Sequence, residues 1–201
     1  MKKVLKLLKL IGKLILIFLL TSVVMVAVFR FVPIPITLYQ ITNAISGDGL
    51  TKDWASYDEV SPYFYRAVIA AEDARFYSHS GVDWRAVEDA KKHNAQYPKK
   101  RRQGASTITM QTAKNTFLWH GRNYVRKGLE VYFSYLMEFF WGKKRILEVY
   151  GNVVEMGEGM YGVEAASQKY FGKSASKLTK RQAALLAAIL PNPKRWNPAK
   201  P

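Results

Sequence analysis

The chain has 201 residues, no cysteine and a formal net charge of +16. Its length allows one domain plus an anchor, and the lack of cysteine excludes disulfides and thiolate metal sites. The three histidines are too scattered to predict a zinc cluster, and the strong positive charge indicates a polyanionic partner.

The N-terminal segment is basic and then apolar. Residues 10–29 carry one charged side chain, Lys13, and a helix of that length covers roughly 30 Å, the thickness of a bilayer core. Residues 1–9 are lysine-rich, so the positive-inside rule places them in the cytoplasm and exports the rest. We therefore predict a cytoplasmic N-terminus over 1–9, a transmembrane anchor over 10–30 and a juxtamembrane segment over 31–54.

A cleaved signal peptide is the alternative to a retained anchor. Such a peptide usually has a shorter apolar region, followed by a cleavage site of small residues. The stretch Val26–Arg30 is a poor site of that kind, which favours the anchor. Because an exported domain does not normally meet nucleic acid, the remaining positive charge indicates anionic or phosphate-bearing lipid as the partner instead.

The chain from 55 to 201 is predicted to form one mainly α-helical domain, because no strand pattern is evident. Ser61–Pro62 is a helix-start signal, which predicts a helix to about Phe76. A second helix is expected over 106–115, with the serine at its start as the cap. Residues 91–103 are basic and nearly free of apolar side chains, and we expect a mobile surface loop there.

The second half of the domain predicts three further helices. Apolar residues recur at the helical period over about 122–141, and another helix is expected over about 143–154. The stretch Thr179–Gln182 is a capping box ahead of an apolar segment that ends at Pro191. This pattern predicts a buried helix that the proline stops.

A candidate catalytic carboxylate, Glu72, lies near the end of the first helix of this domain. Its neighbours Ala70, Ala71, Phe76 and Tyr77 are apolar or aromatic, and such surroundings raise the proton affinity of a carboxylate toward neutral. A carboxyl group of this kind suits general acid or base catalysis. An ordinary exposed glutamate is the simpler alternative, and this string by itself favours it.

A polar face is predicted on the helix that follows. Thr107, Gln111 and Lys114 are spaced four and then three residues apart, so they share one side of a helix. Hydroxyl, amide and ammonium groups together form a surface suited to phosphate. The alternative is an ordinary solvated helix face.

A basic stripe is predicted on the next helix. Arg122, Arg126 and Glu130 are spaced by four residues each, with Lys127 beside them. Two guanidinium groups aimed at one region bind phosphate well. The alternative is an i,i+4 salt bridge of small effect, about a few tenths of a kcal/mol.

Four strings in this order carry a resemblance that none carries alone. They are Glu72–Gly81, Gly104–Asn115, Arg126–Glu130 and Lys144–Asn152, and they follow an apolar N-terminal segment. Together they resemble the glycosyltransferase family that polymerises peptidoglycan from lipid II, in its monofunctional transglycosylase form. The resemblance covers about residues 55–198.

The chain departs from the family pattern at two positions. Met110 stands where the family usually has glutamine, and Gly151 stands where it usually has leucine. A glycine within a helix costs up to about 1 kcal/mol. We expect the neighbouring Tyr150 and Asn152 to have structural roles.

The resemblance implies a lysozyme-like helical fold and inverting transfer of the undecaprenyl-pyrophosphoryl-linked chain to the 4-hydroxyl of lipid II. Glu72 matches the base that deprotonates this hydroxyl, and Glu130 matches the second essential carboxylate. Lys114 matches the residue that contacts the donor pyrophosphate. The implied substrate-binding residues are Asp73, Ser106, Thr107, Gln111, Lys114, Asn115, Arg122, Arg126 and Lys127.

No cofactor is expected to be required, although the chemistry is compatible with a divalent cation such as Mg²⁺ or Mn²⁺. The expected partners are lipid II, the growing glycan chain, membrane lipid and other proteins of wall synthesis or division. The expected location is the cytoplasmic (inner) membrane, with the catalytic domain on its outer side.

Two other functions remain open at this point. A lysozyme-like hydrolase would also use a carboxylate in a helical fold, but it would not need the phosphate-suited cations. A non-enzymatic membrane scaffold would bind lipid or partner proteins without needing Glu72. The stretch Ser174–Lys177 matches the Ser-x-x-Lys of penicillin-binding transpeptidases, but no Lys-Thr-Gly follows it, so no transpeptidase activity is expected.

Overall fold

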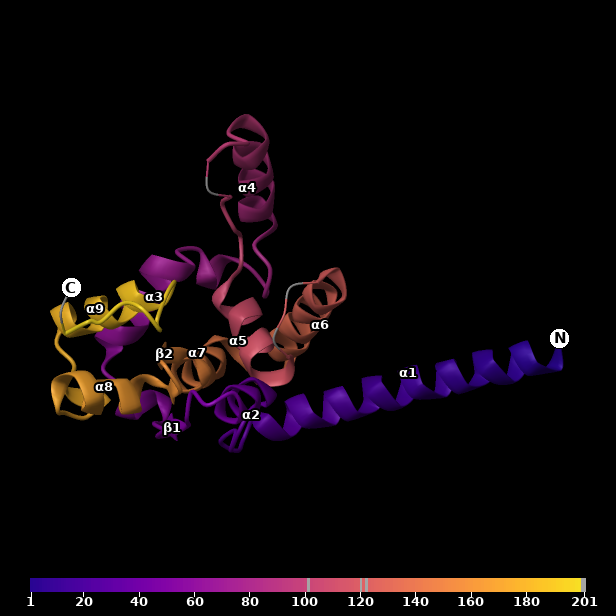
Figure 1. Ribbon diagram of the computed structural model, residues 1–201, viewed down its shortest axis with the longest axis horizontal. Helices are drawn as coiled ribbons and strands as arrows, with labels where there is room; N and C mark the ends of the chain where they lie inside the picture. Colours follow the sequence, from indigo (N-terminus) through magenta and orange to yellow (C-terminus); the bar gives the residue numbers. More distant parts are fainter. Residues whose placement is uncertain (101, 120, 122, 200–201) are drawn as a thin grey trace.

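The computed structural model describes residues 1–100, 102–119, 121 and 123–199. The described part is mainly helical, as predicted (Figure 1). Its α-helices are α1 (Lys2–Phe29), α2 (Leu38–Ile45), α3 (Pro62–Glu72), α4 (Trp84–Gln96), α5 (Ile108–Phe117), α6 (Tyr124–Phe140), α7 (Gly142–Val153), α8 (Val163–Phe171) and α9 (Lys180–Ile189). Short 3₁₀ helices cover Tyr57–Glu59, Phe76–Ser78 and Ala175–Lys177.

The apolar N-terminal helix α1 projects away from the helical body (Figure 1). It begins at Lys2, so the lysine-rich N-terminus belongs to the same helix as the apolar stretch, and the whole of α1 is long and apolar enough to cross a membrane. The C-terminal part of α1 packs against the body. The hydroxyls of Ser22 and Tyr132 are 2.6 Å apart, and Trp141 Nε1 donates to the Val26 carbonyl at 2.6 Å.

The juxtamembrane segment is joined to the body by a helix and a small sheet. Asn43 in α2 donates to the Tyr161 hydroxyl at 2.6 Å. Strand β1 (Thr51–Lys52) pairs in parallel with β3 (Met160–Tyr161), which pairs antiparallel with β2 (Glu155–Gly157). The sequence showed no strand pattern because strands of two or three residues are too short to display an alternation.

Two predicted helix ends are wrong by a few residues. Helix α3 ends at Glu72 rather than near Phe76, because Asp73 leaves the helical conformation, with φ −159° and ψ 70°. Helix α5 is capped by Thr107 rather than Ser106, since the Thr107 side chain accepts a hydrogen bond from the Met110 amide at 3.1 Å.

The prediction of a loop over 91–103 is wrong in its first half. Residues 91–96 form the end of α4, which projects from the body (Figure 1). The Asp83 side chain caps this helix by accepting from the Ala86 amide at 2.9 Å. An exposed i,i+4 ion pair between Glu88 and Lys92, 2.9 Å apart, also lies on the helix. A polar helix with such caps and pairs forms without an apolar stripe.

Three further helices agree with their predicted ranges, whereas α2 and α8 were not predicted. Helices α6 and α7 lie within a few residues of the expected bounds, and the Thr179–Gln182 capping box begins α9. Helix α9 buries one face only, since Ala184 and Ala188 on its other side are exposed. The core forms where α5 packs against α6 and α7, and where α3 packs against α9.

Candidate active site

Helix α5 is the centre of the candidate site, because it carries the polar face, packs against α6, which carries Glu130, and contacts Glu72 through Gln111. Glu72 is the last residue of α3 and is half-buried. The side-chain amide of Gln111 donates a hydrogen bond to Glu72 Oε2 at 2.7 Å. The structure therefore brings Glu72 and Gln111 together from positions far apart in the chain.

The apolar enclosure expected around Glu72 is largely wrong. Ala70, Ala71 and Tyr77 are exposed, whereas Phe76 is fully buried in the core. The environment of Glu72 is instead set by a polar neighbour, the Gln111 amide, and by a hollow of about 190 Å³ that Glu72 lines. An open carboxylate beside a hollow is accessible to a reacting hydroxyl group.

Asp73 is buried and occupied by contacts within the protein. Its Oδ2 accepts from the Ile108 amide at 3.0 Å, and its Oδ1 lies 3.0 Å from His79 Nε2. Asp73 thus joins the end of α3 to the start of α5. In this structure its contacts are those of a residue that holds Glu72 and α5 in place.

Ser106 and Thr107, both predicted to bind substrate, differ in exposure. Thr107 is buried, and its hydroxyl donates to the Gly81 carbonyl besides capping α5. Ser106 is exposed and lies 3.3 Å from the Lys127 ammonium. Both residues line the hollow beside Glu72.

Lys114 lies further along the same face of α5 as Gln111. It is half-buried, and burial lowers its pKa, while the nearby Glu130 and Glu72 carboxylates act in the opposite direction. No described residue forms a hydrogen bond or ion pair with its ammonium group. Gln111, Lys114 and the buried Asn115 line a second hollow of about 350 Å³.

The basic stripe on α6 is arranged around Glu130. Arg126 Nη1 is hydrogen-bonded to Glu130 Oε1, and Lys127 Nζ lies 3.1 Å from Glu130 Oε2. Arg126 and Glu130 are both buried, and Arg126 Nε has no hydrogen-bond partner among the described residues. The i,i+4 salt bridge weighed as the alternative does form, but it is buried and lies beside Lys114. Arg122, the remaining member of the predicted stripe, lies outside the described residues.

Tyr150 on α7 was predicted to be structural and also contacts the site. It is fully buried, and its hydroxyl lies 3.4 Å from Gln111 Oε1. Asn152 is structural as predicted, since its amide bonds both the nitrogen and the oxygen of the Ala55 backbone, at 2.9 and 2.8 Å. No local sequence signal marks Tyr150 as a neighbour of Gln111, because the contact depends on how α5 packs against α7.

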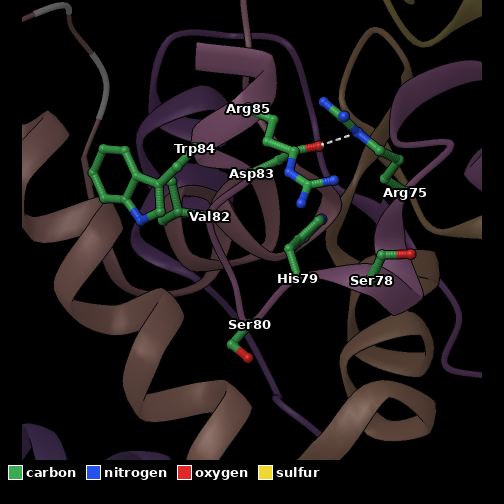
Figure 2. Close-up of a pocket in the computed structure, with 8 residues that line it drawn as sticks. All are labelled: Arg75, Ser78, His79, Ser80, Val82, Asp83, Trp84 and Arg85. Atoms are coloured by element: carbon green, nitrogen blue, oxygen red, sulfur yellow. Dashed lines mark hydrogen bonds and ion pairs between the residues drawn. The ribbon is translucent and has the colours of Figure 1, made fainter. Parts of the chain in front are cut away.

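A third hollow of about 370 Å³ shares Arg75 and Asp83 with the hollow beside Glu72 (Figure 2). Figure 2 shows Arg75 and Trp84 on opposite sides of it, with the Arg75–Asp83 ion pair of 2.8 Å drawn. In the described part of the chain, one group of side chains could hold a metal ion: Asp73, His79 and Asp83, whose ligand atoms lie within 4.8 Å of one another.

This group does not fit a divalent cation. One Asp83 oxygen accepts from the Ala86 amide and the other from Arg75 Nε. The Asp73 oxygens are held by His79 and the Ile108 amide. A guanidinium group therefore already supplies the positive charge, and the oxygens that a metal would need are in use.

Comparison with known proteins identifies relatives along nearly the whole chain. The Transglycosylase family model matches residues 39–201. A biosynthetic peptidoglycan transglycosylase of Caulobacter vibrioides is 54% identical over 179 residues, which cover 89% of this chain and 77% of the relative.

Two further relatives carry the same name. The protein of Bdellovibrio bacteriovorus is 50% identical over 199 residues, which cover 96% of this chain and 79% of the relative. The protein of Bacteroides thetaiotaomicron is 46% identical over 202 residues, which cover 98% of this chain and 81% of the relative.

Proposed function

Because the chain belongs to the transglycosylase family, we propose that it elongates peptidoglycan glycan chains from lipid II. The donor is the growing chain, linked through C1 of its terminal sugar to undecaprenyl pyrophosphate. The acceptor is the 4-hydroxyl of lipid II. Attack of this hydroxyl on C1 forms a β-1,4 linkage with inversion of configuration, and the pyrophosphate leaves.

Glu72 is the base in this proposal. Its carboxylate lies beside the hollow that Ser106 and Thr107 also line, so an acceptor hydroxyl placed there can transfer its proton to Glu72 as it attacks. The Gln111 amide donates a hydrogen bond to the carboxylate and holds it beside the hollow.

The leaving pyrophosphate is bound by the cations on α5 and α6. Lys114, Arg126 and Lys127 carry three positive charges and Glu130 one negative charge, which leaves an excess of two positive charges. The Lys114 ammonium has no partner among the described residues, and neither does Arg126 Nε. Positive charge held in place where negative charge develops is a large catalytic contribution.

The single observation that carries this proposal is the hydrogen bond between Glu72 and Gln111. Gln111 also lines the hollow that contains Lys114, so this bond joins the base to the phosphate-binding side. A hydrolase that cleaves glycan strands releases no pyrophosphate, so it would not need a cation such as Lys114, unpaired among the described residues, on that side.

Helix α1 keeps the enzyme at the bilayer that holds both lipid substrates. Its contacts with the body through Ser22 and Val26 favour a retained anchor over a cleaved peptide. By the positive-inside rule, we propose that the lysine-rich end of α1 lies in the cytoplasm and the body lies on the outer side of the cytoplasmic membrane. The positive side chains supply the charge at the leaving group, so no metal ion is required.

The test is incubation of the detergent-purified protein with labelled lipid II, followed by gel analysis of glycan polymers. Polymer from the wild type but not from Glu72→Gln supports the proposal, and activity that persists in EDTA supports metal independence. Absence of polymer, together with release of soluble fragments from purified cell wall, would contradict it in favour of a hydrolase. Absence of both activities would favour a scaffold.

A further inference from the structure

We propose that Tyr150 is a positioning residue for Glu72 and acts through the side-chain amide of Gln111. The three groups form a chain of hydrogen bonds across three helices: Tyr150 on α7, Gln111 on α5 and Glu72 at the end of α3. The proposal rests on the proposed function, because it concerns the base of that reaction.

The donor and acceptor at each hydrogen bond follow from the chemistry of the three groups. An ionised carboxylate only accepts hydrogen bonds, so the end of the Gln111 amide that faces Glu72 must be its NH₂ group. The amide oxygen then points the other way, toward the Tyr150 hydroxyl at 3.4 Å. A donor at that position favours this orientation of the amide over the reversed one.

Tyr150 is suited to remain that donor. Its side chain is fully buried, and burial together with the Glu72 and Asp73 charges raises its pKa well above the ordinary value. The hydroxyl therefore keeps its proton throughout the neutral range. Among the described residues, Gln111 is its only hydrogen-bond partner.

The residue next to Tyr150, Gly151, lies where α7 meets aromatic side chains of α3. Gly151 faces α3, and a Cβ atom at this position would lie 3.5 Å from both the Phe64 and the Tyr65 rings. This is ordinary contact distance, so an alanine would fit here, whereas a larger side chain would have to displace the two rings on α3, the helix that ends at Glu72. Gly151, which departs from the family pattern, therefore lies where α7, the helix of Tyr150, contacts α3, the helix of Glu72.

Loss of the Tyr150 hydroxyl removes the restraint on the amide. If the amide of Gln111 rotates, its oxygen faces the Glu72 carboxylate, and two acceptors oppose each other. The other charged groups near Glu72 are Lys114, which lies on α5, and Asp73, Arg75 and Asp83, which line the same hollow. Arg75 is paired with Asp83, and among the described residues none of the four donates a hydrogen bond to Glu72. The ionised form of the base is then less favoured, so the reaction requires a higher pH.

The test is the pH profile of lipid II polymerisation by Tyr150→Phe. We expect about a tenfold fall in kcat at neutral pH, little change in KM, and an acid limb displaced to higher pH. The matched control is Tyr65→Phe, because the Tyr65 hydroxyl is also buried, lies near Gly151 and has no hydrogen-bond partner among the described residues. This variant is expected to retain the wild-type profile.

A double-mutant cycle tests the route through Gln111. Gln111→Ala should show the same displacement of the acid limb, and adding Tyr150→Phe to it should cause no further loss. Wild-type kcat and an unchanged profile in Tyr150→Phe would overturn the proposal, as would additive losses in the double variant. If Tyr150→Phe does not fold, an unchanged pH profile in Gln111→Ala would overturn the proposal instead. Absence of polymer from the wild type would instead contradict the proposed function itself.

Discussion

The Glu130 carboxylate lies against the Arg126 guanidinium one helical turn earlier in α6, and both side chains are buried. Removal of one member of such a pair leaves the other charge buried without compensation, which costs about 3–5 kcal/mol. The pair therefore affects stability as well as the proposed binding of pyrophosphate.

Glu130→Gln is expected to lose polymerase activity and to lower the free energy of unfolding by about 3 kcal/mol, because Arg126 loses its counter-charge. Urea unfolding and the lipid II assay measure the two effects. The double variant Arg126→Leu, Glu130→Leu should recover most of the stability but none of the activity. A Glu130→Gln protein as stable as the wild type would show that Arg126 is solvated rather than buried.

Glu72→Gln is expected to abolish polymerisation, with a loss of at least about 10²-fold, and to leave the fold intact. Glu72 is half-buried, and a glutamine oxygen can still accept the hydrogen bond from Gln111. Circular dichroism, thermal unfolding and binding to lipid II vesicles should match the wild type. Normal turnover by this variant would exclude Glu72 as the base.

Lys114→Met is expected to reduce turnover by about 10²- to 10³-fold and to stabilise the protein at neutral pH. Burial lowers the pKa of Lys114 below its ordinary value of 10.5, so its charged form is disfavoured in the folded state. This cost is fully present below the folded-state pKa and falls as the pH rises from there to 10.5.

The stability gained in Lys114→Met should accordingly be largest near neutral pH and shrink toward pH 10.5. Thermal unfolding at a series of pH values measures this difference. Lys127→Met is the control, because Lys127 is exposed and its replacement should not raise stability. An equal gain in both variants would show that burial of Lys114 is not the cause.

Gly151→Ala is expected to stabilise the protein by up to about 1 kcal/mol, because alanine has the higher helix propensity. The added Cβ would lie at ordinary contact distance, 3.5 Å, from the Phe64 and Tyr65 rings. Gly151→Leu, which restores the usual residue of the family, should destabilise it by about 1–3 kcal/mol through overpacking. Equal stability of the two variants in urea would show that α3 and α7 separate easily.

Local patterns in the sequence were sufficient for much of the fold. The apolar length of α1, the periodicity of α6 and the capping box of α9 predicted these helices. The end of α3 and the cap of α5 were misplaced, because both depend on Asp73 and Thr107 bonding to distant backbone groups. Helix α4 was not predicted, because its stability comes from a cap and an ion pair rather than from an apolar stripe.

The sequence by itself determined the membrane-anchor candidate, the helical class and the residue types of the site, since composition, periodicity and motif spacing are local properties. Only the tertiary structure decided which of those residues meet. Gln111 lies 39 positions from both Glu72 and Tyr150. Their contacts exist because α5 packs against α7 and because Asp73 joins the end of α3 to the start of α5. The burial of Arg126 with Glu130 has the same origin, since helix packing, and not the four-residue spacing, removes a side chain from water.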